Sequence, residues 1–276
     1  MNLRKPSHNQ LPTSVTFRYI WIFLIVLFSL LSLITIIQYQ PTRESSSESI
    51  SNFPTTTPVP SSAKPTITPI SLSPSLPPIQ TVIRNAPFAS QAPYGQWSDA
   101  RFQDACEETS SLIVYSWVHN LPLTPQIAND TIIKLAQYQT DNYNSFVDTS
   151  VEDTVTRILQ GYFQLSNIEI ITPKDVSDLI RILQTNKLII APMNGQLLDN
   201  PNFTAPGPNR HMLVINGYDA NTQQFITQDP GTRNGRNFRY TSSNLWQSIR
   251  DYPTGEHVDI PKPIIKRVIV VPQNDS

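Results

Sequence analysis

The chain has 276 residues, a formal net charge of -1 and a charged fraction of 15%. Its lysines and arginines are dispersed, which argues against a nucleic-acid-binding surface. One cysteine and four scattered histidines show no metal-ligand spacing, so we expect neither a metal nor another cofactor.

An apolar segment lies close to the N-terminus. Residues 1–18 carry three basic and no acidic residues, and residues 19–37 form an unbroken run of 19 uncharged residues. That is close to the ~20 residues that a helix needs to cross a membrane, and no small-residue cleavage site follows. We therefore expect a cytoplasmic tail over 1–18 and a signal anchor over 19–38, with the rest of the chain extracytoplasmic by the positive-inside rule.

Residues 39–81 have the composition of a linker. Nine prolines and sixteen serines or threonines occur within 41–80, with few large apolar residues. Such a segment buries too little apolar surface to offset the entropy of ordering its backbone. A disordered linker over 39–81 is thus expected to lead into one folded domain over 82–272.

The first half of this domain predicts helices. One is expected from about residue 104 to 118, and a second begins after Thr124 as N-cap with Pro125 at the first helical position. A third begins near Ser150, where Asp153 completes a capping-box pattern. A fourth is expected to begin at 172–173 and to end near 186.

The second half predicts strands. The β-branched runs at 188–193, 212–218, 224–229 and 263–271 are bounded by Gly, Pro and Asn, and a short helix is expected near 243–250. The segment 216–225 is typical of a hairpin connection. Helices followed by strands predict an α+β fold in which the helical half packs on an antiparallel sheet.

The only cysteine, Cys106, is placed at the start of the first predicted helix. A helix N-terminus and a nearby imidazolium both lower a thiol pKa, and His211, at the start of a predicted strand, could supply the second effect. Asp229 could orient the imidazole of His211. Gln91 could donate its amide, together with the Cys106 N–H, to a developing oxyanion.

The chain also resembles a known family through three segments: PFASQAPYGQWSD with DACEETS, then GPNRHMLVINGYD, then FITQDPGTRNG. Together they resemble the bacteriocin-processing (double-glycine leader) cysteine peptidases and their stand-alone relatives, which have a papain-like fold. The resemblance covers most of 82–272. It implies a catalytic set of Gln91, Cys106, His211 and Asp229.

Two departures from the family pattern stand beside this resemblance. Many members have a glycine directly after the nucleophile, whereas this chain has Glu107-Glu108, whose charges would raise the thiol pKa. Many members also have a short spacing from glutamine to cysteine, whereas here it is 15 residues, which leaves Gln103 as a competing oxyanion donor.

The sequence therefore predicts a membrane-tethered extracytoplasmic cysteine peptidase that forms an acyl-thioester, with a polypeptide or a cell-wall peptide as substrate. Two alternatives stay open: a catalytically inactive papain-like binding module on a stalk, and a peptide transferase. No GxxxxGK[ST] motif occurs, so no ATPase domain is expected in this chain. Phe88, Tyr94 and Trp97 could line a cleft, although core packing is the commoner role of such aromatics. The long loop 194–210 could hold substrate.

Overall fold

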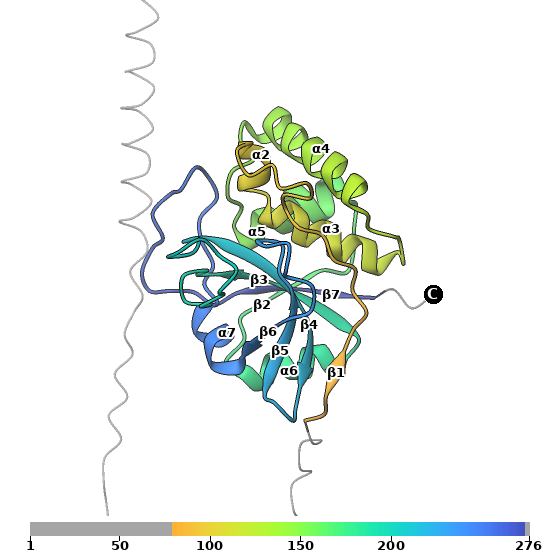
Figure 1. Cartoon of the computed structure of the whole chain (residues 1–276), viewed down its shortest axis with the longest axis vertical. Helices are drawn as coiled ribbons and strands as arrows, with labels where there is room; N and C mark the ends of the chain where they lie inside the picture. Colours follow the sequence, from red (N-terminus) through yellow and green to blue (C-terminus); the bar gives the residue numbers. More distant parts are fainter. Residues whose placement is uncertain (1–78, 274–276) are drawn as a thin grey trace, which may run out of the picture. The chain divides into compact units, whose positions relative to one another are not determined.

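The structure, a computed structural model, describes residues 79–273 (Figure 1). The predicted tail over 1–18, the anchor over 19–38 and the linker up to residue 78 lie outside the described residues. Within 79–273 no helix combines the length and the apolarity needed to span a membrane.

A seven-stranded antiparallel sheet forms the centre of the described region. Its main order is β2-β7-β3-β4-β5-β6, and β1 pairs with the end of β4. The strands are β1 (Val82–Ile83), β2 (Glu169–Ile171), β3 (Lys187–Met193), β4 (His211–Asp219), β5 (Gln224–Gln228), β6 (Phe238–Thr241) and β7 (Val268–Pro272). The expected hairpin connection is confirmed, because β4 and β5 pair antiparallel on either side of residues 220–223.

Most of the helices lie between the first two strands in the chain, and the last two helices follow β2 and β6. They are α2 (Ala100–Gln103), α3 (Cys106–Val118), α4 (Pro125–Tyr143), α5 (Val151–Asp153), the π-helix η1 (Thr154–Tyr162), α6 (Val176–Gln184) and α7 (Ser242–Ser248). Two predicted caps are confirmed, since the Thr124 and Ser150 side chains accept hydrogen bonds from the N–H groups of Ile127 and Asp153. The predicted α+β class with an antiparallel sheet is confirmed as well.

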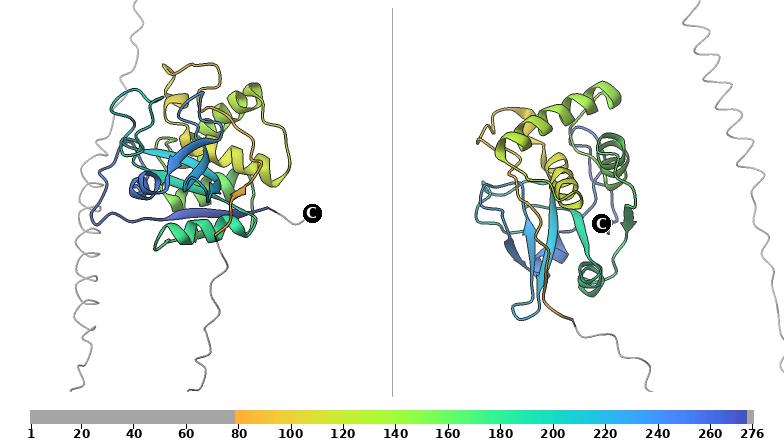
Figure 2. Two further views of the ribbon diagram at one scale, coloured as in Figure 1. Left: turned by 60° about the horizontal axis from the view of Figure 1, so that its bottom comes forward. Right: turned by 90° about the vertical axis from the view of Figure 1, so that its right-hand side faces the viewer.

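Alternating side chains of the central strands face two separate cores. On one face, Ile190 and Val214 pack with Ile113 and Trp117 of α3. On the other face, neighbouring strand residues such as Ile189 pack with the apolar sides of α6 and α7. The sheet is thus covered by α3, with α4 packed outside it, on one face and by α6 and α7 on the other (Figures 1 and 2).

Several predicted boundaries were wrong. Helix α6 begins at Val176 rather than at 172–173, because the Asp175 side chain caps it by accepting from the Asp178 N–H. Strand β7 begins at Val268 rather than at 263. The short strands β1, β2 and β6, the helix α2 and the π-helical form of η1 were not foreseen, since short segments carry little periodic signal.

Candidate active site

Cys106 is the first residue of α3, as the sequence predicted. The short helix α2, capped by the Asp99 side chain, ends at Gln103, and three residues later the chain enters α3. Helix α3 is buried along almost its whole length between the sheet and α4. The Ser110 hydroxyl, one turn beyond Cys106, donates to the Met212 carbonyl at 3.1 Å. This bond ties the cysteine helix to the strand that begins with His211.

His211 and Asp229 come together because β4 and β5 are paired strands. His211 is the first residue of β4, and Asp229 follows the last residue of β5. The His211 Nε2–H donates to Asp229 Oδ1 at 2.8 Å, and both side chains are buried. This bond leaves Nδ1 as the imidazole nitrogen that can accept a proton.

The Asp229 carboxylate is held by three further donors. Oδ1 accepts from the Gly231 N–H at 3.0 Å, while Oδ2 accepts from Tyr240 Oη at 2.5 Å and Asn200 Nδ2 at 3.3 Å. Burial by itself would raise the pKa of Asp229, but His211 and these hydrogen bonds outweigh it and lower the pKa. Asp229 is therefore held as a carboxylate.

Two neighbours restrict the His211 ring. The Phe203 ring lies edge-on to it, with ring centroids 5.4 Å apart. A Cβ at Gly231 would lie 2.8 Å from His211 Cε1 and 3.0 Å from Phe203 Cε1, closer than side chains pack. Glycine at position 231 therefore allows the turn after Asp229 to approach the imidazole.

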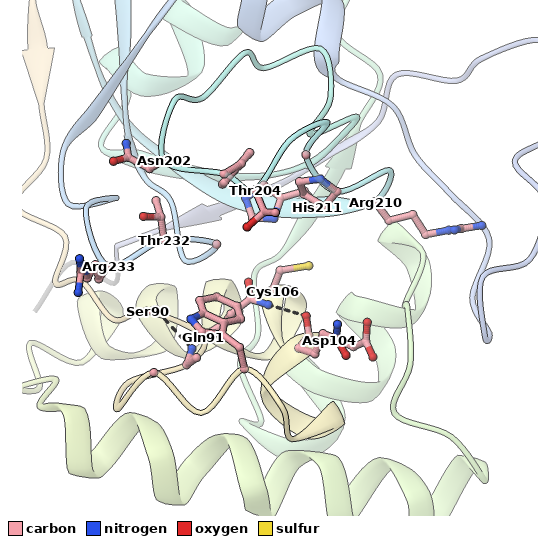
Figure 3. A pocket seen from close by; sticks show the side chains of 18 of the residues that line it. Ser90, Gln91, Asp104, Cys106, Asn202, Thr204, Arg210, His211, Thr232 and Arg233 are labelled. Carbon is pink, nitrogen blue, oxygen red and sulfur yellow. Dashed lines mark hydrogen bonds between the residues drawn. The ribbon is translucent and has the colours of Figure 1, made fainter.

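Cys106 and His211 line one cavity of about 1170 Å³. Figure 3 shows them on opposite sides of the cleft, with Asn202, Thr232 and Arg233 toward one end and Asp104 and Arg210 toward the other. The loop 194–210 supplies much of one wall. Tyr94 and Trp97, 60% and 41% exposed, lie at the cleft rather than in a core.

The thiol of Cys106 does not point its proton at His211. Sγ donates to Glu107 Oε2 at 3.0 Å, and no hydrogen bond within residues 79–273 joins Cys106 to His211. Burial first, and then the charge of Glu107, raises the pKa of the thiol well above its ordinary value.

Gln91 lies beside Cys106, but its amide nitrogen is already engaged. Nε2 donates to the carbonyls of Phe102 and Gln103 at 3.1 and 2.8 Å, and Oε1 is buried without a partner in the described part of the chain. The Gln91 N–H donates to Pro230 O at 2.9 Å and so ties this loop to the turn after Asp229. Gln103 is exposed at the cleft, so the oxyanion role stays a prediction for both glutamines.

One end of the cleft was missed by the sequence reasoning. Asp148 forms an ion pair with Arg210 at 3.3 Å and a hydrogen bond with His257 Nδ1 at 3.1 Å, and all three line the cavity together with Asp104. The positions of Asp104 and Arg210, close to Cys106 and His211 in the chain, could have indicated two of them. No local signal marks Asp148 or His257. Within 79–273 no group of three or more potential metal ligands occurs.

Comparison with known protein families places the chain in one of them. Residues 83–253, more than half of the chain, match the model of the Peptidase_C39 like family, and the chain belongs to this family. No curated protein matches. A solved structure of a candidate C39-like peptidase from Bacillus anthracis is 15% identical, covering 70% of this chain and 98% of that one with a TM-score of 0.38.

Proposed function

We propose that the chain is a cysteine peptidase in which Cys106, His211 and Asp229 act together. Membership of the C39-like family supports a peptidase, and hence a polypeptide substrate. The observation that carries the proposal is the single cavity lined both by a thiol at a helix N-terminus and by an imidazole that a buried carboxylate orients.

The chemistry follows from these positions. The Cys106 Sγ attacks the scissile carbonyl carbon while its proton passes to His211 Nδ1, and the same proton then goes to the leaving amine. Water hydrolyses the resulting thioester and regenerates the thiol. Asp229 holds the imidazole in the tautomer that exposes Nδ1 and stabilises the imidazolium.

Backbone and side-chain donors near Sγ supply the oxyanion site in this proposal. The Cys106 N–H is at the start of α3, where amide groups have no partner within the helix. Either Gln91, after turning its amide away from the carbonyls of α2, or Gln103 supplies the second donor. One such donor contributes on the order of 3 kcal/mol to transition-state stabilisation.

The test compares the purified full-length chain with its Cys106→Ala variant, using fluorescein-labelled casein as substrate. We expect the wild-type protein to release labelled peptides and the variant to keep only about 10⁻⁶ of that rate, the loss typical of removing a nucleophile. Trapping the labelled acyl-enzyme on Cys106 by acid quenching and mass spectrometry identifies the nucleophile. Equal casein hydrolysis by both proteins contradicts the proposal.

A second candidate is a tethered peptide-binding module without catalysis. It is favoured by the hydrogen bond that Cys106 donates to Glu107 and by the raised thiol pKa. In that case Cys106→Ala leaves peptide binding unchanged, and no acyl-enzyme forms with any peptide tested.

We also propose, from the sequence of residues 1–81 alone, that the peptidase domain is tethered outside the cytoplasm. Trypsin added to intact cells is expected to remove the domain while the residues before 19 stay protected. Protection of the domain until the membrane is broken contradicts this location.

A further inference from the structure

Glu107 is the closest polar partner of the candidate nucleophile. Its Oε2 accepts the Cys106 Sγ–H at 3.0 Å, and its side chain is 2% exposed. In this arrangement the sulfur keeps its proton, because a carboxylate accepts hydrogen bonds and cannot donate to a thiolate.

The other oxygen of Glu107 is held from two loops. Oε1 accepts from Tyr252 Oη at 2.8 Å and from the Thr149 N–H at 3.3 Å. Tyr252 Oη also lies 3.4 Å from the His211 carbonyl oxygen. Both groups at Oε1 are donors, so the carboxylate has one orientation, with Oε2 facing the sulfur.

The ionisable side chains around Glu107 are acidic groups. The titratable groups around it are Cys106 and Glu108 on α3, Asp148 on the loop between α4 and α5, and Tyr252 on the loop after α7. Within the described residues no cation forms an ion pair with Glu107, since Arg210 and His257 pair with Asp148. Burial and Asp148 raise the pKa of Glu107.

We propose that Glu107 is a positioning residue that keeps the Cys106 thiol protonated and turned from His211 until substrate binding breaks this hydrogen bond. The inference rests on the proposed function for its catalytic meaning, since the released proton then passes from Sγ to His211 Nδ1. In this proposal the hydrogen bond to Glu107 keeps the peptidase latent, so that the enzyme becomes active when substrate binds.

The variant Glu107→Gln tests this directly. Tyr252 and Thr149 still require an acceptor at the position of Oε1, so the amide oxygen takes that place and the NH₂ group faces Sγ. The substitution thereby removes a negative charge and presents a donor that stabilises the thiolate. We expect the apparent pKa of Cys106 alkylation by iodoacetamide to fall by at least about one unit, which is about tenfold in rate at pH 7.

Two further variants of the full-length chain sharpen the test. Glu169→Gln removes an exposed carboxylate of β2 that pairs with Lys187, and it should leave the alkylation profile unchanged. Tyr252→Phe removes a donor from Glu107 and makes the carboxylate a stronger acceptor, so alkylation at pH 7 should slow severalfold. Opposite shifts in the Glu107→Gln and Tyr252→Phe proteins are not expected from loosened packing, which would speed alkylation in both.

An unchanged or slower alkylation of Glu107→Gln, or an equal acceleration by Tyr252→Phe, overturns the proposal. This readout needs no substrate. If Glu107→Gln accelerates alkylation but neither it nor the wild-type protein forms an acyl-enzyme with casein, the proposed function fails while the role of Glu107 at the thiol stands.

Discussion

The two walls of the cleft differ in how their buried polar groups are satisfied. On the sheet wall, both oxygens of Asp229 accept hydrogen bonds, and the pKa of this carboxyl is lowered despite its burial. On the helix wall, which is formed by α3, Glu108 Oε2, Thr109 Oγ1 and Ser111 Oγ lie behind Cys106 and are buried without a partner within residues 79–273. Burial raises the pKa values of Cys106 and Glu108 well above their ordinary range.

This difference shows where activation has to occur. The His211–Asp229 pair is already arranged to carry charge, because its donors and acceptors are paired before any substrate is bound. On α3, burial and the neighbouring charge of Glu107 instead disfavour the thiolate of Cys106, since a buried charge without a compensating partner is costly. In the proposed peptidase, the imidazole is therefore preorganised and the thiol is the group that must be released.

The largest expected effect comes from Asp229→Asn, which replaces the carboxylate that holds the His211 imidazole. An asparagine can present its NH₂ group to Nε2 and favour the wrong imidazole tautomer, so kcat should fall by about 10³–10⁴-fold. KM should change little, because Asp229 is buried behind His211. Steady-state hydrolysis of casein measures both; a loss of less than about tenfold would remove Asp229 from the proposed mechanism.

A smaller loss is expected from Gly231→Ala. The added Cβ would meet His211 Cε1 at 2.8 Å, and the ring must shift by a fraction of an ångström to accommodate it. A misplaced catalytic group can cost about 10²-fold in rate, and we expect a loss of that order in kcat. Thermal melting should show a native fold; full activity would mean that the imidazole position is not critical.

On the helix wall, Glu108→Gln should stabilise the protein in a pH-dependent way. Burial and Glu107 raise the folded-state pKa of Glu108 well above its ordinary 4.5. Stability linked to this group is therefore fully present below pH 4.5 and is lost as the pH rises toward the folded-state pKa. We expect the melting temperature of the wild-type protein to fall over this range, and the variant to lose less.

Measuring both melting curves from about pH 4.5 to about pH 8 tests this point, with Glu169→Gln as the matched exposed control. The amide oxygen that Glu108→Gln introduces can still accept from Gln139 Nε2, as the Glu108 carboxylate does. If the melting temperatures of the wild-type protein and Glu108→Gln fall in parallel as the pH rises, Glu108 is not the source of the pH-dependent loss of stability.

The smallest effect is expected from removing the hydrogen bond that joins α3 to β4. Ser110→Ala removes the 3.1 Å hydrogen bond to the Met212 carbonyl and should cost about 1 kcal/mol of unfolding free energy. Chemical denaturation measures this loss. If the bond also sets the approach of α3 to β4, kcat falls more than KM rises; an unchanged kcat would confine Ser110 to stability.

Local sequence patterns predicted much of the fold. Thr124 with Pro125 and Ser150 with Asp153 mark helix starts, because capping needs only residues close in the chain. The β-branched runs predicted the central strands β3, β4 and β5 for a similar reason. The short strands β2 and β6 escaped, since their pairing partners, and not their own composition, make them strands.

For the candidate site, the order of motifs along the chain selected Cys106, His211 and Asp229. The structure places the first two at one cavity and the third in a hydrogen bond behind the imidazole. Asp148 and His257 were not selected, because they meet only through loops 109 residues apart in the chain. Gln91 was selected for its amide, and only the fold shows that its nitrogen is engaged by the end of α2.

The amino-acid sequence by itself determined the α+β class, the principal helices and strands, and the residue types able to perform thiol chemistry, because these depend on local propensities and side-chain identity. Tertiary structure alone decided whether the Cys106 thiol keeps its proton and which group it faces. Glu107 follows Cys106 in the chain, but Tyr252, 145 residues away, orients its carboxylate and burial excludes the water that would screen it. A proton's position depends on distance and desolvation, and both arise only when the chain is folded.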